Sequence, residues 1–163
     1  MNSPSLFTYL TRTIICLQEL WSFTPYMNSS LHGYHPLVYK LRNSCQGGRV
    51  GIYIKSNIKF SLLPQYSIFV ERILETIFVE IILPNNSKYI VGSIYRPGAT
   101  HPTLTPLQLF TEFYELFKNI LDNISNYSDL LLMGDINIDV LQYGHNPRAT
   151  DFIELFFLMV YFN

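Results

Sequence analysis

The sequence predicts a single layered α/β domain, and three observations lead to this prediction. Short apolar runs bounded by turn-forming residues recur along the chain, which is the pattern of strands buried in a sheet. One long amphipathic segment, residues 105–124, lies between two of these runs and provides the crossover that parallel strands require. The length of 163 residues suffices for one domain with a substantial core and is too short for two.

Strands are expected wherever apolar and β-branched residues cluster between turn formers. The hairpin turn between two of them is expected at residues 84–87, where the sequence is Pro-Asn-Asn-Ser. Glu75 opens one strand and Glu80 lies within it, and both are predicted to be surface or edge charges. The predicted strands are residues 14–17, 50–55, 58–63, 76–83, 89–95 and 130–133.

Two helices are expected. The first begins with Thr105 as N-cap and Pro106 in the first position, and an apolar stripe at helical spacing continues to Ile124. The stripe packs this helix on a sheet and has no role in binding a cofactor. The second helix covers the apolar run 152–162, with Thr150 as N-cap and Asp151 in the first turn.

The composition restricts the class of protein. Hydrophobic residues make up 48% of the chain and charged residues 14%, with a mean hydropathy of +0.17, so aggregation or an obligate neighbour is expected. The net charge is −1 and the 11 Lys and Arg residues are scattered, so no basic stripe indicates nucleic acid. Cys16 and Cys45 form no disulfide framework or zinc motif, which favours a reducing, intracellular compartment, nuclear or cytoplasmic. No apolar run is long enough to span a membrane.

The most informative stretch is Gly134-Asp135-Ile136-Asn137, directly after the apolar run 130–133. In layered α/β folds, ligands gather beyond the carboxyl ends of buried strands. Side chains two residues apart in an extended segment point the same way, so Asp135 and Asn137 are expected to face one target. The alternative is a strand-to-turn junction in which both side chains bind their own backbone. Asp139 could add a carboxylate, although a loop-capping role is preferred.

Further polar groups follow two other predicted strands. Glu19 follows the apolar run 14–17, so two carboxylates at two strand ends suggest a metal site. Mg²⁺ prefers a few carboxylate oxygens and keeps several waters, and Glu19 and Asp135 meet that requirement. Tyr95 and Arg96 end a third strand, and each can donate hydrogen bonds to phosphate oxygens. Alone, each is better explained as a core aromatic or a surface ion pair.

Taken together and in this order, these stretches resemble the endonuclease/exonuclease/phosphatase superfamily, and most closely the endonuclease domain of non-LTR retrotransposons. The resemblance covers about residues 13–158. It is carried by Ile15-Cys16-Leu17-Gln18-Glu19, Gly47-Gly48-Arg49-Val50-Gly51-Ile52-Tyr53-Ile54-Lys55, Leu74-Glu75, Val79-Glu80-Ile81, Ile94-Tyr95-Arg96-Pro97 and Gly134-Asp135-Ile136-Asn137-Ile138-Asp139.

The resemblance implies a four-layer α/β sandwich, with two mixed β-sheets packed face to face and helices outside. It also implies a divalent-metal phosphodiesterase site between the sheet tops, with Mg²⁺ or Mn²⁺ held by Glu19. Tyr95 would contact the scissile phosphate, and Asp135 would orient or deprotonate the attacking water. Asn137 would hold phosphate and nucleophile in line, and Arg96 would bind substrate. DNA is the expected substrate, contacted through its phosphate backbone, and a reverse transcriptase domain is the usual partner.

The sequence departs from the family pattern at both ends. The family has an Asn-bearing strand and a helix before the Glu strand, and residues 1–12 are too short for both, so Asn2 is a weak counterpart. The family's general-base Ser-Asp-His segment does not occur in the sequence. The four histidines lie in loop-like contexts, and His145 could approach Asp135. A truncated domain with weak or no turnover is therefore expected, because a positioned base contributes roughly two to four orders of magnitude in rate.

Three hypotheses follow. The first is a Mg²⁺-dependent DNA endonuclease domain of a mobile element. The second is a catalytically dead remnant that acts at most as a binding fragment. The third is a phosphatase or exonuclease of the same superfamily.

Overall fold

The computed structural model describes residues 13–20, 30–40, 49–83, 85–98, 101–124 and 129–161. The sequence predictions that concern Asn2, Cys45, Gly47 and Gly48 lie outside these residues. The described elements follow the predicted order of strands, one long helix, another strand and a C-terminal helix.

The larger sheet has five strands among the described residues. Its main path is β4 (Lys59–Leu62), β6 (Leu74–Ile82), β7 (Lys88–Tyr95) and β8 (Leu130–Asp135), and the short β5 (Phe69–Val70) also pairs with β6. All pairs are antiparallel except β7 and β8, which run parallel. Helix α2 (Pro106–Ile124) connects these two strands and is the predicted crossover.

The smaller sheet has three antiparallel strands among the described residues. Strand β3 (Gly51–Ile54) lies between β1 (Ile14–Leu17) and β2 (Val38–Tyr39). The sequence analysis predicted β1 and β3 but did not predict β2 or β5, which have only two residues each.

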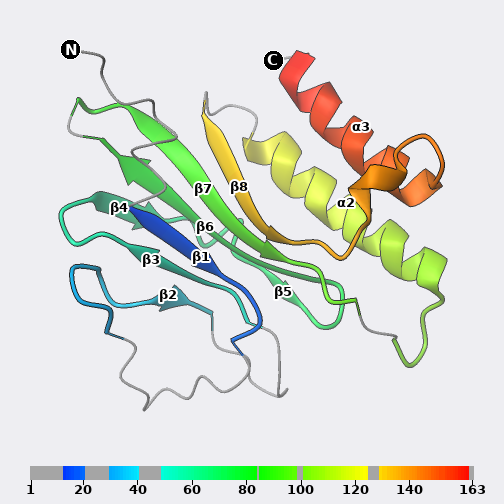
Figure 1. Ribbon diagram of the computed structural model, residues 1–163, viewed down its shortest axis with the longest axis horizontal. Helices are drawn as coiled ribbons and strands as arrows, with labels where there is room; N and C mark the ends of the chain where they lie inside the picture. The colour runs from blue at the N-terminus through cyan, green and yellow to red at the C-terminus, as the bar shows by residue number, and fades with distance from the viewer. Residues whose placement is uncertain are drawn as a thin grey trace.

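The two sheets pack face to face, and α2 and α3 (Pro147–Tyr161) cover the outer face of the larger one (Figure 1). One apolar core lies between the sheets and includes Ile52, Ile77 and Val91. A second core lies between the larger sheet and the helices and includes Phe78, Phe113 and Phe152. The described residues thus form three layers, one helical and two of sheet. No helix among them is long and apolar enough to cross a membrane.

The capping of α2 matches its prediction. The backbone N–H of Gln108 donates to Thr105 Oγ1 at 3.3 Å, and the backbone N–H of Thr105 donates to Gln108 Oε1 at 2.9 Å, so the two residues form a reciprocal cap. The apolar stripe faces the sheet as expected, and its buried members are Leu109, Phe110, Phe113, Phe117, Ile120, Leu121 and Ile124.

The predicted start of the C-terminal helix was wrong. Helix α3 begins at Pro147, and Asn146 caps it by accepting a hydrogen bond from the backbone N–H of Arg148 at 2.9 Å. Thr150 lies inside the first turn, where its hydroxyl group donates to the carbonyl oxygen of Asn146. The Asn-Pro pair is the stronger start signal because an Asx side chain caps well and proline suits the first helical position.

The prediction that Glu75 and Glu80 are surface charges was also wrong. Both lie in β6, an interior strand covered by the second sheet on one face and by α2 on the other, and their exposed fractions are 3% and 8%. Glu80 Oε1 lies 2.7 Å from Lys88 Nζ on β7, and Glu75 Oε2 accepts a hydrogen bond from the backbone N–H of Arg49 at 2.9 Å. These contacts make burial of the carboxylates tolerable.

Candidate functional site

Tyr95 and Asp135 are neighbours in the larger sheet. They are directly paired in the parallel register of β7 and β8, and the backbone N–H of Arg96 donates to the carbonyl oxygen of Asp135 at 2.8 Å. Tyr95 packs in the core between the sheets, as does Met133, two residues before Asp135. Because side chains two apart in a strand share a face, Asp135 is directed to the same side as Tyr95, at the strand ends.

The β8 strand reaches this position through Gly134. A Cβ atom on Gly134 would lie 1.8 Å from the carbonyl oxygen of Ile94, which is closer than any real contact. Only glycine therefore allows β7 and β8 to remain paired as far as Asp135.

Glu19 reaches Tyr95 from the other sheet. The Tyr95 hydroxyl group donates a 2.8 Å hydrogen bond to Glu19 Oε1, although the two residues are 76 positions apart. Glu19 follows the end of β1 and has a φ of 55°. This left-handed conformation is unfavourable for a residue with a Cβ, and such strain is concentrated at functional sites.

Side chains of β1 and β7 fix the strand that carries Glu19. Gln18 Nε2 donates to Ser93 Oγ at 3.0 Å, and Ser93 Oγ donates to the carbonyl oxygen of Leu17 at 3.5 Å. The thiol of Cys16, on β1, also forms a hydrogen bond with Ser93. Burial raises the pKa of this thiol to about 12, and the hydrogen bond with Ser93 lowers it in part. The Cys16 thiol is therefore a neutral group at neutral pH.

Asp135 and Asn137 form a local network in the turn after β8. Asp135 Oδ1 accepts from the backbone N–H of Asn137 at 3.0 Å, and Asp135 Oδ2 accepts from Asn137 Nδ2 at 3.3 Å. Asn137 Nδ2 also donates to the carbonyl oxygen of Arg96 at 2.8 Å, and Asn137 has a φ of 49°. The turn therefore has the local bonds of a strand-to-turn junction and also fixes an exposed carboxylate and amide beside Tyr95.

Arg96 lies on the opposite face of the sheet from Tyr95. Its guanidinium group is 5.1 Å from the centroid of the Phe113 ring on α2, and its Nη1 donates at 3.2 Å to the carbonyl oxygens of Ile136 and Asn137. Burial lowers the pKa of Arg96, and repulsion from Arg148 lowers it further. Arg96 therefore stabilises the turn after β8 through its hydrogen bonds to backbone carbonyl oxygens, and it does not contact the group around Tyr95 and Glu19.

Glu75 is a residue that sequence reasoning missed. It is directly paired with Tyr95 across β6 and β7, so Glu75, Tyr95 and Asp135 form a row across three neighbouring strands. It shares a strand face with Ile77 and Val79, which lie in the core between the sheets. This alternation was a usable signal, since it placed Glu75 on the core face.

Other predicted residues have local structural roles. Asp139 caps the short 3₁₀ helix η1 (Val140–Gln142) by accepting from the backbone N–H of Leu141, as preferred in the sequence analysis. His35 bonds the carbonyl oxygen of Ile58, and His101 accepts backbone hydrogen bonds from its own loop. His145 lies exposed in the turn between η1 and α3.

The chemistry of Glu19 and Asp135 suits a hard divalent cation. Both side chains present carboxylate oxygens, and both residues are exposed, so that water can supply further ligands. The Tyr95 hydroxyl group occupies one lone pair of Glu19 Oε1 and leaves the other carboxylate positions open. Within the described ranges, no three His, Cys, Asp or Glu side chains form a group that could hold a metal ion.

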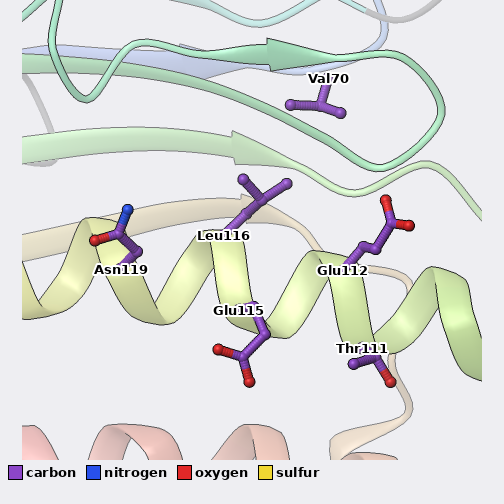
Figure 2. Close-up of a pocket in the computed structure, with 6 residues that line it drawn as sticks. All are labelled: Val70, Thr111, Glu112, Glu115, Leu116 and Asn119. Atoms are coloured by element: carbon purple, nitrogen blue, oxygen red, sulfur yellow. The ribbon is translucent and has the colours of Figure 1, made fainter.

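Two cavities lie on the helical side of the larger sheet. One, of about 450 Å³, lies between β5 and α2 and contains none of the predicted site residues; Figure 2 shows its lining by Val70, Thr111, Glu112, Glu115, Leu116 and Asn119. The other has a volume of about 220 Å³ and is lined by Asn137 and Arg96. Of the two, only the smaller adjoins the turn after β8.

Comparison with known proteins supports the fold. No protein-family model and no curated protein sequence matches the chain. Among solved structures it is similar to the catalytic domain of APE2 from Xenopus laevis, with a TM-score of 0.53 and 15% sequence identity. The similarity covers 87% of this chain and 58% of that domain. This likeness confirms the expected α/β fold of two sheets packed face to face with helices outside, of which the described residues form three layers.

Proposed function

We propose that this chain is a metal-dependent phosphodiesterase domain that acts on DNA, of the type found as the endonuclease domain of non-LTR retrotransposons. The observation that carries the proposal is the contact between Glu19 on one sheet and Tyr95 on the other, with Asp135 beside Tyr95. The likeness in fold to the APE2 catalytic domain supports the broader class of nuclease. The retrotransposon branch rests on the sequence motifs, and a reverse transcriptase domain is the partner that it implies.

The proposed roles follow from the side chains. Glu19 would hold Mg²⁺ or Mn²⁺, which supplies positive charge against the phosphoryl oxygens when it is bound. The Tyr95 hydroxyl group holds the Glu19 carboxylate with its single proton, and it would donate that proton to a phosphate oxygen only when Glu19 turns to the metal ion. Asn137 holds the Asp135 carboxylate in one orientation, so that Asp135 can accept a hydrogen bond from an attacking water.

Turnover is expected to be slow. His35 bonds the carbonyl oxygen of Ile58 and His101 is engaged in its own loop, so Asp135 is the candidate base among the residues described around Tyr95. The Ser-Asp-His segment that supplies the family's general base does not occur in the sequence, and a positioned general base contributes roughly two to four orders of magnitude in rate.

A catalytically dead binding fragment is the second candidate. It is favoured by the local bonds of Asp135, whose two oxygens both accept from Asn137 as they would in a purely structural turn. A phosphatase or exonuclease with the same site is a further alternative within the first class.

Nicking of supercoiled plasmid DNA in Mg²⁺ tests the proposal. We expect slow nicking by the native chain, and loss of nicking in Glu19→Gln and in Asp135→Asn, which each remove one charge with little change in shape. Asp122→Asn is the matched control, because Asp122 is an exposed carboxylate that pairs with Lys118 on α2. Nicking that persists in both site variants would refute the roles of Glu19 and Asp135, and no nicking by the native chain would favour the binding fragment.

A further inference from the structure

Three arginines from distant parts of the chain meet at the smaller cavity. Arg72 comes from the turn between β5 and β6, Arg96 follows β7, and Arg148 lies in the first turn of α3. Asn137 lines the same cavity of about 220 Å³, and Ile73 and Leu109 add apolar surface. We refer to this cavity as the arginine pocket.

The arginine pocket concentrates positive charge. Its lining within the described part of the chain includes no Asp or Glu. Glu71 Oε1 lies 3.9 Å from Arg72 Nε, but this pair is exposed, with exposed fractions of 54% and 47% for the two side chains, so water screens it. Arg96 and Arg148 are close enough for their charges to repel each other. An anion between them would relieve this repulsion.

The guanidinium groups are held in position before any ligand binds. Arg96 lies over the ring of Phe113 and donates to two backbone carbonyl oxygens, and Arg148 lies 5.9 Å from the centroid of the Phe110 ring. Pro106, the first residue of α2, also lines the pocket, so the first turns of α2 and α3, where the positive ends of the helix dipoles lie, both border it. Planar guanidinium groups bind phosphate oxygens through paired donors.

We propose that the arginine pocket binds a phosphate group in the backbone of a DNA strand, next to the phosphate that lies at Tyr95 and Asp135. This inference rests on the proposed function. The link between the two positions is Asn137, which bonds Asp135 on one side and lines the pocket on the other. The pocket would supply local positive charge that a chain with a net charge of −1 lacks overall.

The salt dependence of DNA binding tests this pocket. Oligonucleotide binding is measured by fluorescence anisotropy over a series of KCl concentrations, with Ca²⁺ in place of Mg²⁺ to limit cleavage. For each phosphate contact that is lost, the slope of log K against log salt should fall by about 0.7 for single-stranded and about 0.9 for double-stranded DNA. We expect this change in Arg72→Gln and in Arg148→Gln, while Arg148→Lys retains most of the slope.

Lys118→Gln is the matched control for charge. Lys118 lies on the exposed face of α2 and pairs with Asp122 at 2.7 Å, and it does not line the pocket. Its substitution should leave the slope unchanged. If the slope of log K against log salt is the same in the native chain, Arg72→Gln and Arg148→Gln, the pocket does not bind DNA phosphate and this inference is refuted. The proposed nuclease function would still stand if the native chain nicks plasmid DNA.

Titration with inorganic phosphate separates the pocket from the proposed function. We expect saturable shifts of the backbone amide resonances of Gly98, Asn137 and Arg148 in the native chain, and loss of these shifts in the Arg72→Gln/Arg148→Gln double variant. Circular dichroism and thermal unfolding of the double variant establish that it is folded. Phosphate binding without any DNA binding would overturn both the DNA assignment and the proposed function.

Discussion

The hydrogen bond between Tyr95 and Glu19 joins the two sheets at the point where the proposed chemistry takes place. Tyr95 is 6% exposed, so its ring is fixed by the core, whereas Glu19 is exposed and its carboxylate is held by the 2.8 Å contact. A buried donor thus orients an exposed carboxylate, which is carried by a residue whose backbone has an unfavourable φ of 55°.

The strength of this contact is measurable with a double-mutant cycle. We expect Tyr95→Phe to lower the free energy of unfolding by about 1.5 kcal/mol, because a hydrogen bond to a charged group is lost. In urea unfolding, Tyr95→Phe and Glu19→Gln should show a coupling energy of about 1 kcal/mol. Tyr143→Phe, at an exposed tyrosine, should have no effect. A coupling energy of zero would contradict the contact.

Cys16 should be unreactive in the folded chain. Burial raises the pKa of its thiol from 9.0 to about 12, so the thiolate that reacts with alkylating agents is scarce at pH 8. In a Cys45→Ser background, iodoacetamide should modify Cys16 far more slowly in the folded chain than in urea, as followed by mass spectrometry. Rapid modification of the folded chain would contradict the burial of Cys16.

The same shift predicts how stability changes with pH. The folded thiol has the higher pKa, so Cys16 has no effect on stability below about pH 9. Between pH 9.0 and about 12 the unfolded chain loses the proton first, and stability falls. Cys16→Ala should reduce this fall in urea unfolding experiments across that range.

At the scale of elements, the parallel pair of β7 and β8 determines where Asp135 lies. This pair was predictable, because α2 has clear capping and amphipathic signals and separates two apolar runs. The two-residue strands β2 and β5 were not predictable, since their pairing depends on tertiary neighbours and not on local pattern.

Gly134→Ala should disrupt the pairing of β7 and β8. The new Cβ atom would meet the carbonyl oxygen of Ile94 at 1.8 Å, so one strand must move. We expect a loss of at least about 3 kcal/mol in the free energy of unfolding. Gly144→Ala is the matched control, because Gly144 has a φ of 78° and open space around it, and it should cost only about 1 kcal/mol. Similar losses for both variants would contradict this close approach.

The start of α3 provides a second prediction for an element. Asn146→Ala should lower the free energy of unfolding by about 1 kcal/mol, because the cap of the Arg148 N–H is lost. Asp151→Ala, inside the helix and exposed, should be nearly neutral in the same thermal or urea measurement. A larger loss of stability in Asp151→Ala than in Asn146→Ala would contradict the cap at Asn146 and would support the later helix start predicted from Thr150 and Asp151.

At the scale of the whole molecule, the longer strands and α2 were predictable from local patterns, whereas the packing of the two sheets and the helices on one another was not. Glu75 was expected at the surface because the prediction did not use the alternation that places Glu75 on the same strand face as the core residues Ile77 and Val79. Arg96 was expected to bind substrate, and its guanidinium group lies on the opposite face of the sheet from Tyr95, because neighbouring residues leave a strand end in opposite directions. The candidate site was predicted as a group because all of its residues lie at or just after the end of an apolar strand. Tyr95 and Asp135 end β7 and β8, and Glu19 and Asn137 lie in the segments that follow β1 and β8.

We propose that Glu19 holds a divalent ion beside Tyr95 and Asp135. Paramagnetic Mn²⁺ tests it most directly, because it broadens the NMR resonances of nearby nuclei whether or not the chain has activity. We expect selective broadening of the amide resonances of Glu19, Tyr95 and Asp135 at low Mn²⁺ concentrations, and its loss in Glu19→Gln but not in Asp122→Asn. Broadening centred elsewhere, or equal broadening in the Glu19→Gln variant, would contradict the claim.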